Sequence, residues 1–457
     1  MDVIAAISTG SAAAGIGVVR VSGEGCFALC DRVFRPRNGK PFAQQVSHKM
    51  VFGEMLDATG AVIDRGLAVR FAEGHSYTGE DSAEFHCHGS PVVLRELLSA
   101  LFAAGARQAQ AGEFTRRAFL NGKMDLTEAE AVIDLIDAQT AAAAKNAAAQ
   151  LDGGLRRRLE PIQEALIDIT SRFYAVVDYP DEDIEDIHPQ QVEDALSTAL
   201  SALSALSRTA QRGRVLKNGV RTAIIGRPNA GKSSLLNALA GFDRAIVTDI
   251  PGTTRDTVEE TALCGGVLLR LVDTAGIRST ADEVERLGVE RSRRAAEDAD
   301  LVLAVFDGSQ PLTAEDRAIM ELAAGQRHWL LIANKADLPS PAPLTWNGVG
   351  TAPAAVLSLS ARTGAGLDTL EQAVAALFPA ISAAESGSLL TNARQESAVQ
   401  RALDAVQRAL DALRAGFTPD AILTDAEEAL DAIGELTGRT AKEEIVGAVF
   451  SRFCVGK

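Results

Sequence analysis

The chain has 457 residues, 47% of them hydrophobic, and its 61 acidic and 45 basic side chains give a net charge of −16. This length exceeds what one hydrophobic core supports and predicts two or three domains. No apolar run approaches the roughly 18 residues of a membrane span, and the acidic balance argues against tight, independent binding to nucleic acid.

The cysteines and the start of the chain bear on the compartment. The five cysteines are odd in number and scattered, which argues against a disulfide framework. Residues 1–4 lack the basic and apolar regions of a signal peptide. We therefore expect a cytoplasmic protein without a membrane span.

Residues 1–118 alternate short β-like runs with turn clusters, which is typical of an α+β domain. One helix is expected at 91–103, and the expected strands are 16–21, 68–71 and 82–87.

In the third of these strands, His86, Cys87 and His88 together suggest a metal site. Successive side chains of a strand point to opposite faces, so Cys87 would point away from the two histidines. We expect no metal there.

Residues 120–212 have a helical period. The Ala-rich segment 141–150 is expected to continue the helix that begins near residue 126. The residues expected on one face of that helix are Leu126, Ala129, Ile133 and Ile136.

The helical period returns after Pro379, where one apolar stripe is expected to face a core. A single helical domain built from both flanks, with the middle of the chain inserted into it, explains this arrangement. The residues of the stripe are Val399, Leu403, Val406, Leu410 and Leu413.

The middle of the chain opens with a phosphate-binding pattern, G-x-x-x-x-G-K-[ST], which residues 226–233 fit without a mismatch. The apolar run 220–225 predicts a buried strand before it, and 234–240 predicts a helix after it. In that setting the backbone N–H groups surround phosphate oxygens, Lys232 reaches the β- and γ-phosphates, and the Ser233 hydroxyl ligates Mg²⁺. The chain therefore binds a nucleoside triphosphate, and the other phosphate-site residues are Asn229, Ala230, Gly231 and Ser234.

Three later segments, each at the end of an apolar run, indicate that the nucleotide is GTP. The first is Asp273-Thr274-Ala275-Gly276, whose carboxylate can hold the Mg²⁺ shell and whose glycine amide can sense a γ-phosphate. In the second, Asn334-Lys335-Ala336-Asp337, the last carboxylate can accept two hydrogen bonds from guanine but would stay unpaired opposite adenine. The third, Ser360-Ala361-Arg362, offers a backbone amide to the guanine O6.

Hydrolysis requires a different arrangement from that of common small GTPases, because Ile277 stands where they place a water-orienting glutamine. One substitute is a monovalent cation between the β- and γ-phosphates, held by Asn229 and by Thr248-Asp249-Ile250-Pro251-Gly252-Thr253-Thr254. The other is a carboxylate within 282–286 that orients the water. A solvated helix N-terminus explains that acidic cluster equally well.

Two further sets of residues have open interpretations. The arginines at 116–117, 156–158 and 291–294 are candidate RNA-binding patches, although each is more typical of a solvated helix face. Cys454 is either a nucleophile whose pKa Lys457 lowers or a partly buried, inert thiol.

Four segments outside the GTP motifs make a specific combination: 17–23 (GVVRVSG), 77–81 (YTGED), 112–123 (GEFTRRAFLNGK) and 453–457 (FCVGK). Together with the GTP motifs they resemble the MnmE (TrmE) family of bacterial tRNA-modification GTPases over essentially the full length. The resemblance implies an α+β, folate-binding and dimerisation domain at 1–118 and a helical domain split between 119–213 and 379–457. It also implies an inserted Ras-like P-loop G domain with a mostly parallel sheet at 214–378.

The resemblance further implies a homodimer, K⁺-stimulated GTP hydrolysis, and the cofactors K⁺, Mg²⁺ and a reduced folate (5-formyl- or 5,10-methylene-tetrahydrofolate). The family works with a flavoprotein, MnmG (GidA), to add a carboxymethylaminomethyl-type group to C5 of the wobble uridine, U34, of certain tRNAs. The tRNA is expected to be bound in part or mainly through that partner.

Carried over residue by residue, the family pattern assigns the site residues. A pterin has a guanine-like amide edge that suits a carboxylate, and the glutamate tail of a folate suits cations. Without the resemblance, the same folate residues would be assigned to surface charge and an exposed strand. The assignments are K⁺ on Asn229, Thr248, Ile250 and Thr253; Mg²⁺ on Ser233 and Thr254; catalysis by Glu285, Lys232 and Cys454; and folate on Arg20, Glu84, Lys123 and Lys457.

A second functional class stays open, a regulatory or ribosome-assembly GTPase switch that transfers no group. Such a switch requires neither the folate residues nor the segment 454–457, so these features discriminate between the two classes.

Overall fold

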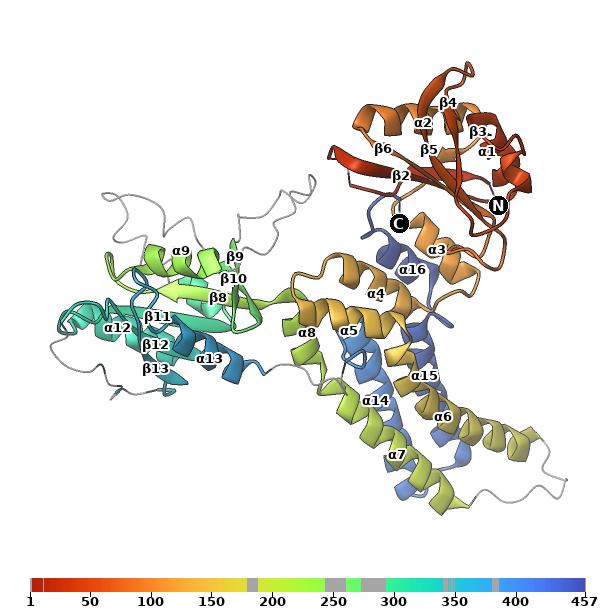
Figure 1. Cartoon of the computed structure of the whole chain (residues 1–457). Coiled ribbons are helices and arrows are strands. Elements are labelled where there is room, and N and C mark those ends of the chain that lie inside the picture. Colours follow the sequence, from red (N-terminus) through yellow and green to blue (C-terminus); the bar gives the residue numbers. More distant parts are fainter. Residues whose placement is uncertain are drawn as a thin grey trace. The chain divides into compact units, whose positions relative to one another are not determined.

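The computed structural model describes residues 2–10, 12–178, 188–242, 260–272, 293–339, 344, 346, 348, 350–379 and 386–456 (Figure 1). None of the helices among these residues is long and apolar enough to cross a membrane. The chain divides into two compact units, residues 1–133, 151–199 and 401–457 in the first and residues 134–150 and 200–400 in the second.

The first unit begins with a seven-stranded sheet in the order β3-β4-β5-β6-β2-β1-β7. Neighbouring strands are antiparallel except for the short parallel pair β1 and β7. The strands and helix predicted for this region are confirmed within β2, β5, β6 and α2. The elements are β1 (Ile4–Ile7), β2 (Ala14–Ser22), α1 (Cys26–Val33), β3 (Phe34–Pro36), the 3₁₀ helix η1 (Phe42–Gln44), β4 (Val51–Leu56), β5 (Val62–Phe71), β6 (Ser82–Gly89), α2 (Pro91–Ala103) and β7 (Arg107–Gln108).

The core of this sheet lies on the face that α1 and α2 cover. Phe34, Phe42 and Phe85 pack there with ring centroids about 6 Å apart, and Leu97 of α2 is fully buried beside them. Because side chains alternate along a strand, Glu84 and the even-numbered neighbours of Phe85 lie on the opposite face. The sheet thus separates an apolar core from a second face that carries polar side chains.

The elements that precede and follow the second sheet in the sequence are helices. In the first unit α6 packs against α15, and α3 packs against α16, where the rings of Phe119 and Phe450 are 6.1 Å apart. The boundary between the two units passes through α4, α7 and α14 and before the last residue of α5. The helices are α3 (Glu113–Leu120), α4 (Leu126–Ile136), α5 (Ala141–Leu151), α6 (Gly154–Asp178), α7 (Pro189–Ser207), α8 (Ala210–Asn218), α14 (Ala393–Arg414), α15 (Pro419–Thr437) and α16 (Glu443–Phe450).

The prediction that 141–150 continues the preceding helix is wrong, because α4 ends at Ile136 and α5 begins at Ala141. Thr140 begins the new helix: its Oγ1 accepts a hydrogen bond from the backbone N–H of Ala143 at 3.0 Å. The predicted apolar face is also shorter than expected. Leu126 and Ala129 are fully buried, whereas Ile136 is 51% exposed in the last turn of α4.

The stripe predicted after Pro379 is confirmed in α14. Val399, Val406 and Leu410 are at most 2% exposed, and Leu403 and Leu413 are half-buried. The spacing of three and four residues places them along one side of the helix, as the sequence period requires.

The second unit contains a six-stranded sheet in the order β13-β12-β11-β8-β10-β9. All pairs are parallel except β9 with β10, and the predicted strands and the helix after 226–233 are confirmed. Buried apolar residues pack on both faces of this sheet, as a parallel sheet covered by helices requires. Its elements are β8 (Val220–Ile225), α9 (Lys232–Phe242), β9 (Glu260–Cys264), β10 (Val267–Val272), β11 (Leu301–Asp307), α12 (Ala314–Ala324), β12 (Trp329–Asn334), β13 (Ala355–Ser358) and α13 (Leu367–Leu377).

The chain runs into and out of this sheet through two segments that meet at a buried carboxylate. Lys217, at the end of α8, forms an ion pair with Asp134 at 2.6 Å, and Thr391 donates a hydrogen bond to the same carboxylate at 2.9 Å. Lys217 also donates to the side chain of Asn392. A side chain at Gly213 would lie 2.1 Å from the carbonyl oxygen of Leu390, so glycine is required for α8 to pass this closely.

Candidate functional site

The phosphate-binding pattern lies between β8 and α9, as predicted. Gly231 has φ 96°, and a Cβ at this position would lie 2.0 Å from Nδ2 of Asn334. Asn229 also adopts a positive φ, 62°. The loop therefore folds tightly over the carboxyl end of the sheet, where backbone N–H groups at a helix N-terminus favour anions.

Lys232 points back into this loop. Its ammonium donates to the carbonyl oxygens of Gly226 at 2.6 Å and Arg227 at 2.8 Å. Burial lowers the pKa of Lys232 from its ordinary value. Ser233 and Ser234 follow it in the first turn of α9. The lysine that the motif places there thus donates to the backbone of the loop itself.

Asn334, at the end of β12, connects two of the predicted GTP segments. Its Nδ2 donates to the carbonyl oxygen of Ala230 at 2.9 Å, and its Oδ1 accepts from the backbone N–H of Ala361 at 3.0 Å. The residue is buried, at 2% exposure. One side chain therefore holds the phosphate loop and the segment 360–362 at a fixed separation.

Asp337 lies beside the same segment. It accepts a hydrogen bond from Oγ of Ser360 at 2.7 Å, and this hydrogen bond lowers the pKa of Asp337. Arg362 is 3.9 Å from the second carboxylate oxygen. The carboxylate is thus kept ionised, as an acceptor for two N–H donors of a base must be.

Lys335, within the second GTP motif, has a backbone conformation and an ion-pair partner that the sequence pattern does not predict. It has φ 65°, and its ammonium pairs with Asp307, at the end of β11, at 2.6 Å. Asp307 was not among the predicted residues. Its only signal in the sequence is its place after an apolar strand.

The other predicted nucleotide residues lie outside the described residues. They include the K⁺ and Mg²⁺ positions of the segment 248–254 and the proposed catalytic glutamate. These residues are Thr248, Asp249, Ile250, Pro251, Gly252, Thr253, Thr254, Asp273, Thr274, Ala275, Gly276 and Glu285.

A second cluster lies on the polar face of the first sheet. Arg20 of β2 and Glu84 of β6 are register partners, and both Nε and Nη2 of the arginine are 2.9 Å from Oε1 of the glutamate. The guanidinium carbon lies 5.4 Å from the ring centroid of Tyr77 and 5.6 Å from that of Phe114. A carboxylate and two aromatic rings are therefore grouped around the Arg20 guanidinium.

Lys123, the third predicted folate residue, lies in the turn that follows α3. Its ammonium donates to the carbonyl oxygen of Gly74 at 3.0 Å. Lys457, the fourth predicted folate residue, lies outside the described residues.

The C-terminal segment lies against the start of the chain. Val455 forms an antiparallel bridge with Ala111, Ser8 donates from Oγ to the carbonyl oxygen of Gly456 at 3.1 Å, and Gly112 donates from its N–H to that of Cys454. Cys454 is exposed, so the partly buried thiol considered above is wrong, while its reactivity stays a prediction.

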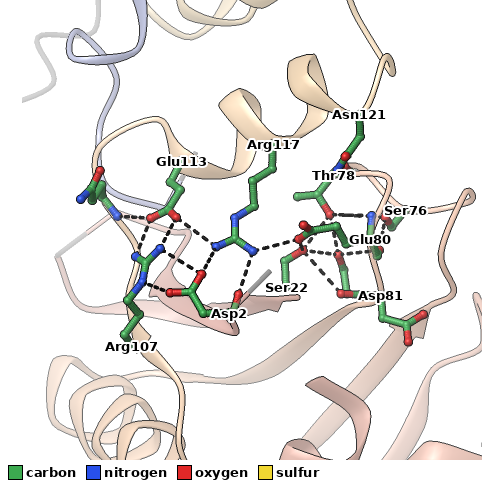
Figure 2. Close-up of polar contacts among 12 residues, drawn as sticks. Asp2, Ser22, Ser76, Thr78, Glu80, Asp81, Arg107, Glu113, Arg117 and Asn121 are labelled. Atoms are coloured by element: carbon green, nitrogen blue, oxygen red, sulfur yellow. Dashed lines mark hydrogen bonds and ion pairs between the residues drawn. The ribbon is translucent and has the colours of Figure 1, made fainter. Parts of the chain in front are cut away.

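The family segments at 77–81 and 112–123 meet in a charged network (Figure 2). Arg117 is 3% exposed and donates to the carboxylates of Glu80 and Glu113, both at 3.0 Å, and of Asp2 at 2.9 Å. Arg107 pairs with Glu113 and Asp2 as well. Burial alone would raise the pKa of Glu113, but hydrogen bonds from Arg107, the Gln110 backbone and Arg117 lower it to about 2.

With the fold and these contacts described, comparisons with known proteins show which family is present. A model described as the GTP-binding protein TrmE N-terminus matches residues 3–123, and one described as the MnmE helical domain matches 126–454. The tRNA modification GTPase MnmE of Roseiflexus sp. is 46% identical over 467 residues, covering 100% of this chain and 99% of that protein. That of Symbiobacterium thermophilum is 43% identical over 457 residues, with the same coverage.

The chain belongs to the MnmE family of tRNA modification GTPases. Its fold agrees with that assignment: an α+β N-terminal region, helices and a P-loop sheet that is mostly parallel. Among solved structures, the cytosolic domain of the T. maritima FeoB iron transporter in GDP form I is 19% identical and covers 51% of this chain and 98% of that chain. The TM-score of this match is 0.24.

In this MnmE-family chain the arginine pairs are not free basic patches. Neither an RNA-binding patch nor a solvated helix face describes Arg117, because its guanidinium is buried among carboxylates. Arg116 pairs with Glu443 and Arg156 with Glu128, each at 3.4 Å. Arg291 lies outside the described residues, and Arg293 pairs with Glu297 at 3.0 Å. Arg116, Arg117, Arg156 and Arg293 thus each pair with a carboxylate of this chain, and the Arg293–Glu297 pair is exposed.

The histidines of β6 have separate partners. His86 lies 3.5 Å from the Glu84 carboxylate, and His88 pairs with Asp64 at 2.9 Å. Cys87 is buried in the core and donates to the carbonyl oxygen of Gly17. The alternation of side chains thus separates the thiol from the two imidazoles, as expected.

Proposed function

We propose that this chain is a K⁺-stimulated GTPase that acts in tRNA modification. With an MnmG (GidA)-type flavoprotein and a reduced folate, it takes part in adding a carboxymethylaminomethyl group to C5 of U34 in certain tRNAs. It acts in the cytoplasm, and tRNA is contacted in part through the partner. Full-length similarity to proteins named tRNA modification GTPase MnmE supports the proposal.

The proposed domains are 1–118, 119–213 with 379–457, and 214–378. The boundary after residue 118 falls within the last turn of α3 and the one after residue 213 falls within α8, whereas the one after residue 378 follows the end of α13 at Leu377. The first domain is proposed to bind folate, the second to be a split helical domain, and the third to be an inserted G domain.

The observation that carries the GTP assignment is the pair of hydrogen bonds made by Asn334. These bonds join Ala230 in the phosphate loop to Ala361, so phosphates and base would be held in one register. Asp337 then accepts from the guanine N1–H and amino group, and the Ala361 N–H serves the O6. In this proposal Lys232 leaves the loop carbonyls for the β- and γ-phosphates.

The residues of the loop also fit the proposed cations. Ser233 lies in the first turn of α9, and its hydroxyl is proposed to ligate Mg²⁺ together with Thr254. Asn229 is proposed to hold K⁺ with Thr248, Ile250 and Thr253. A cation at that place would supply the positive charge that an arginine finger supplies elsewhere, while Glu285 orients the water.

The folate proposal rests on the cluster around Arg20. A carboxylate suits the aminopyrimidine edge of a pterin, and flanking aromatic rings suit its flat faces. Glu84 and Tyr77 supply these groups, and Lys123 and Lys457 are proposed to meet the glutamate tail. Cys454 is proposed to act in the folate-dependent step.

A homodimer is proposed through the polar face of the first sheet. Phe52 and Leu67 are register partners there and are 44% and 38% exposed, and Leu67 is paired in turn with His86. Exposed apolar residues on a sheet face are typical of a protein interface. A second copy covering this face would also enclose Arg20 and Glu84.

GTP turnover in KCl and NaCl at equal ionic strength tests the central claim. We expect strong stimulation by K⁺ in the wild type and loss of turnover in Glu285→Ala. Equal rates in the two salts would contradict the cation assignment and favour the regulatory or ribosome-assembly switch.

Folate binding is tested separately, since any ligand of the native state raises the melting temperature. We expect 5-formyltetrahydrofolate to raise it in the wild type and not in Glu84→Gln. Asp64→Asn is the control, because this residue lies on the same sheet but contacts His88 rather than Arg20.

A further inference from the structure

We propose that Arg117, acting through Glu80, is a positioning residue for the folate site. It fixes the segment 74–81, which we call the 74–81 loop, against the proposed ligand residues. This proposal rests on the proposed folate function. Neither Arg117 nor Glu80 is among the residues assigned to folate above.

The first step is the anchor. The Arg117 guanidinium donates from Nη1 to Glu80 at 3.0 Å and to the carbonyl oxygen of Asp2 at 2.9 Å, and from Nη2 to the carboxylates of Asp2 and Glu113. Figure 2 shows it between α3 and the loop. A buried guanidinium is costly unless its donors are paired, so this geometry is strongly favoured over others. Arg117 therefore holds Glu80 in one place.

The second step concerns the buried hydrogen bonds that hold the 74–81 loop to its neighbouring elements. Glu80 also accepts from Oγ of Ser22 at 3.2 Å, and that hydroxyl is 2.7 Å from Thr78 and 3.0 Å from Ser82. Ser22, Thr78 and Ser82 are all at most 4% exposed. Asn121 donates to the Thr78 carbonyl oxygen at 2.7 Å. The loop is thus fixed to β2, β6 and the end of α3 by polar contacts that exclude water.

The third step is what the loop presents. The Tyr77 hydroxyl is 2.9 Å from that of Thr115, and its ring lies beside the Arg20 guanidinium. At the other end of the loop, the Gly74 carbonyl oxygen accepts from Lys123. The 74–81 loop therefore contacts two of the three described folate residues.

It follows that a change at Glu80 would be felt at the ligand site without a direct contact. If the loop were released, the Tyr77 ring and the Gly74 carbonyl oxygen would no longer hold Arg20 and Lys123 in one arrangement. Preorganised groups bind a ligand more tightly than mobile ones.

The test compares Glu80→Gln with Arg107→Met. Arg117→Ala is avoided because it would leave several buried carboxylates unpaired and endanger folding. Arg107 pairs with Glu113 and Asp2, two of the three carboxylates that Arg117 contacts, and its hydrogen bonds among the described residues go to these carboxylates and to the Gln108 carbonyl oxygen rather than to the 74–81 loop. Both variants thus lose charge pairs of the same network, but only Glu80→Gln removes a charged contact to the 74–81 loop.

Two measurements are made on the full chain: the Kd for 5-formyltetrahydrofolate by calorimetry and amide hydrogen exchange of residues 74–81. We expect Glu80→Gln to weaken binding by about 10-fold and to speed exchange in the loop, in the range that loss of a charge-assisted hydrogen bond gives. Arg107→Met should change both by less than about 2-fold. GTP turnover should be the same in all three proteins.

Normal binding by the wild type with an unchanged Kd in Glu80→Gln would overturn the positioning role and leave the folate function intact. Equal weakening in both variants would also overturn it, because a general loss of charge pairs would then explain the effect. Absence of binding by the wild type would overturn the folate function itself and this proposal with it.

Discussion

The side-chain amide of Asn334 donates to the carbonyl oxygen of Ala230 at 2.9 Å, across 104 positions of the sequence. This bond joins the end of a central strand to the middle of the phosphate loop. The conformation of the phosphate loop therefore depends on Asn334, a residue of the motif assigned to guanine recognition.

Asn334→Ala should weaken the binding of both GTP and GDP, because it removes the bonds to Ala230 and Ala361 and leaves buried groups unpaired. We expect the Kd to rise by about 10- to 100-fold for each nucleotide. Fluorescent-nucleotide titration measures this. Asn38→Ala, in the turn after β3, is the control, and equal affinities in the two variants would contradict the role of Asn334.

Ser360→Ala should shift the pH dependence of GTP binding. The Ser360 hydroxyl lowers the pKa of Asp337, so the ionised acceptor persists to lower pH in the wild type. Affinity is present above that pKa and is lost as pH falls through it. Removing the hydroxyl should move the midpoint of the loss to higher pH, which titrations of Kd from neutral pH down through the titration of this carboxyl measure; an unmoved midpoint would exclude this hydrogen bond as the cause.

Glu113→Gln should destabilise the protein at neutral pH and matter less in acid. The pKa of Glu113 is lowered from 4.5 to about 2 in the folded state, so its ionisation stabilises the fold above about pH 4.5. That contribution declines as pH falls from 4.5 toward 2. We expect a cost of about 2 kcal/mol in urea unfolding at pH 7.

Glu443→Gln is the matched control for that measurement. Its carboxylate pairs with Arg116 but is 88% exposed, so its loss should cost less than about 1 kcal/mol. A Glu113→Gln effect that grew on acidification would have the wrong sign for a carboxyl with a lowered pKa.

Thiol reagents should modify one cysteine in the native protein. Cys454 is exposed, whereas Cys26, Cys30, Cys87 and Cys264 are buried. Burial raises the pKa of Cys87 to about 11 and of Cys264 to about 12, which leaves little thiolate at pH 7. Titration of the native wild type with a chromogenic disulfide should give one fast equivalent, and native Cys454→Ser should give none. The unfolded wild type should give five. More than one fast equivalent in the native wild type would show that a buried site opens.

Local patterns in the sequence were sufficient for the phosphate loop and for the strands that lead into the GTP motifs, but not for β9 and β11. The run 226–233 carries its own geometry, because glycines, a lysine and a serine at fixed spacing between a strand and a helix define a phosphate site. The apolar strands before Asn334 and Ser360 are equally local. Their joint position follows from parallel strands whose carboxyl ends share one edge.

Other features depend on contacts that no local pattern contains. Arg117 belongs to a short basic run, yet three carboxylates from residues 2, 80 and 113 bury it. The end of α4 was missed because Ala-rich sequence favours helix throughout, while Thr140 caps a new one. Arg20 and Glu84 came from the family pattern, since a charged pair across two strands is also typical of an ordinary exposed sheet.

The meeting of Lys217, Asp134 and Asn392 has a consequence for how such a chain can arise and be re-engineered. The chain leaves the helices at residue 217 and returns by residue 392, where the two side chains are hydrogen-bonded to each other. A segment whose two ends are adjacent can be gained or removed as a cassette with little cost in loop closure. Replacing residues 219–390 by a short glycine-rich linker should therefore leave the helices able to fold, and it should also allow other domains to be transplanted at the same point.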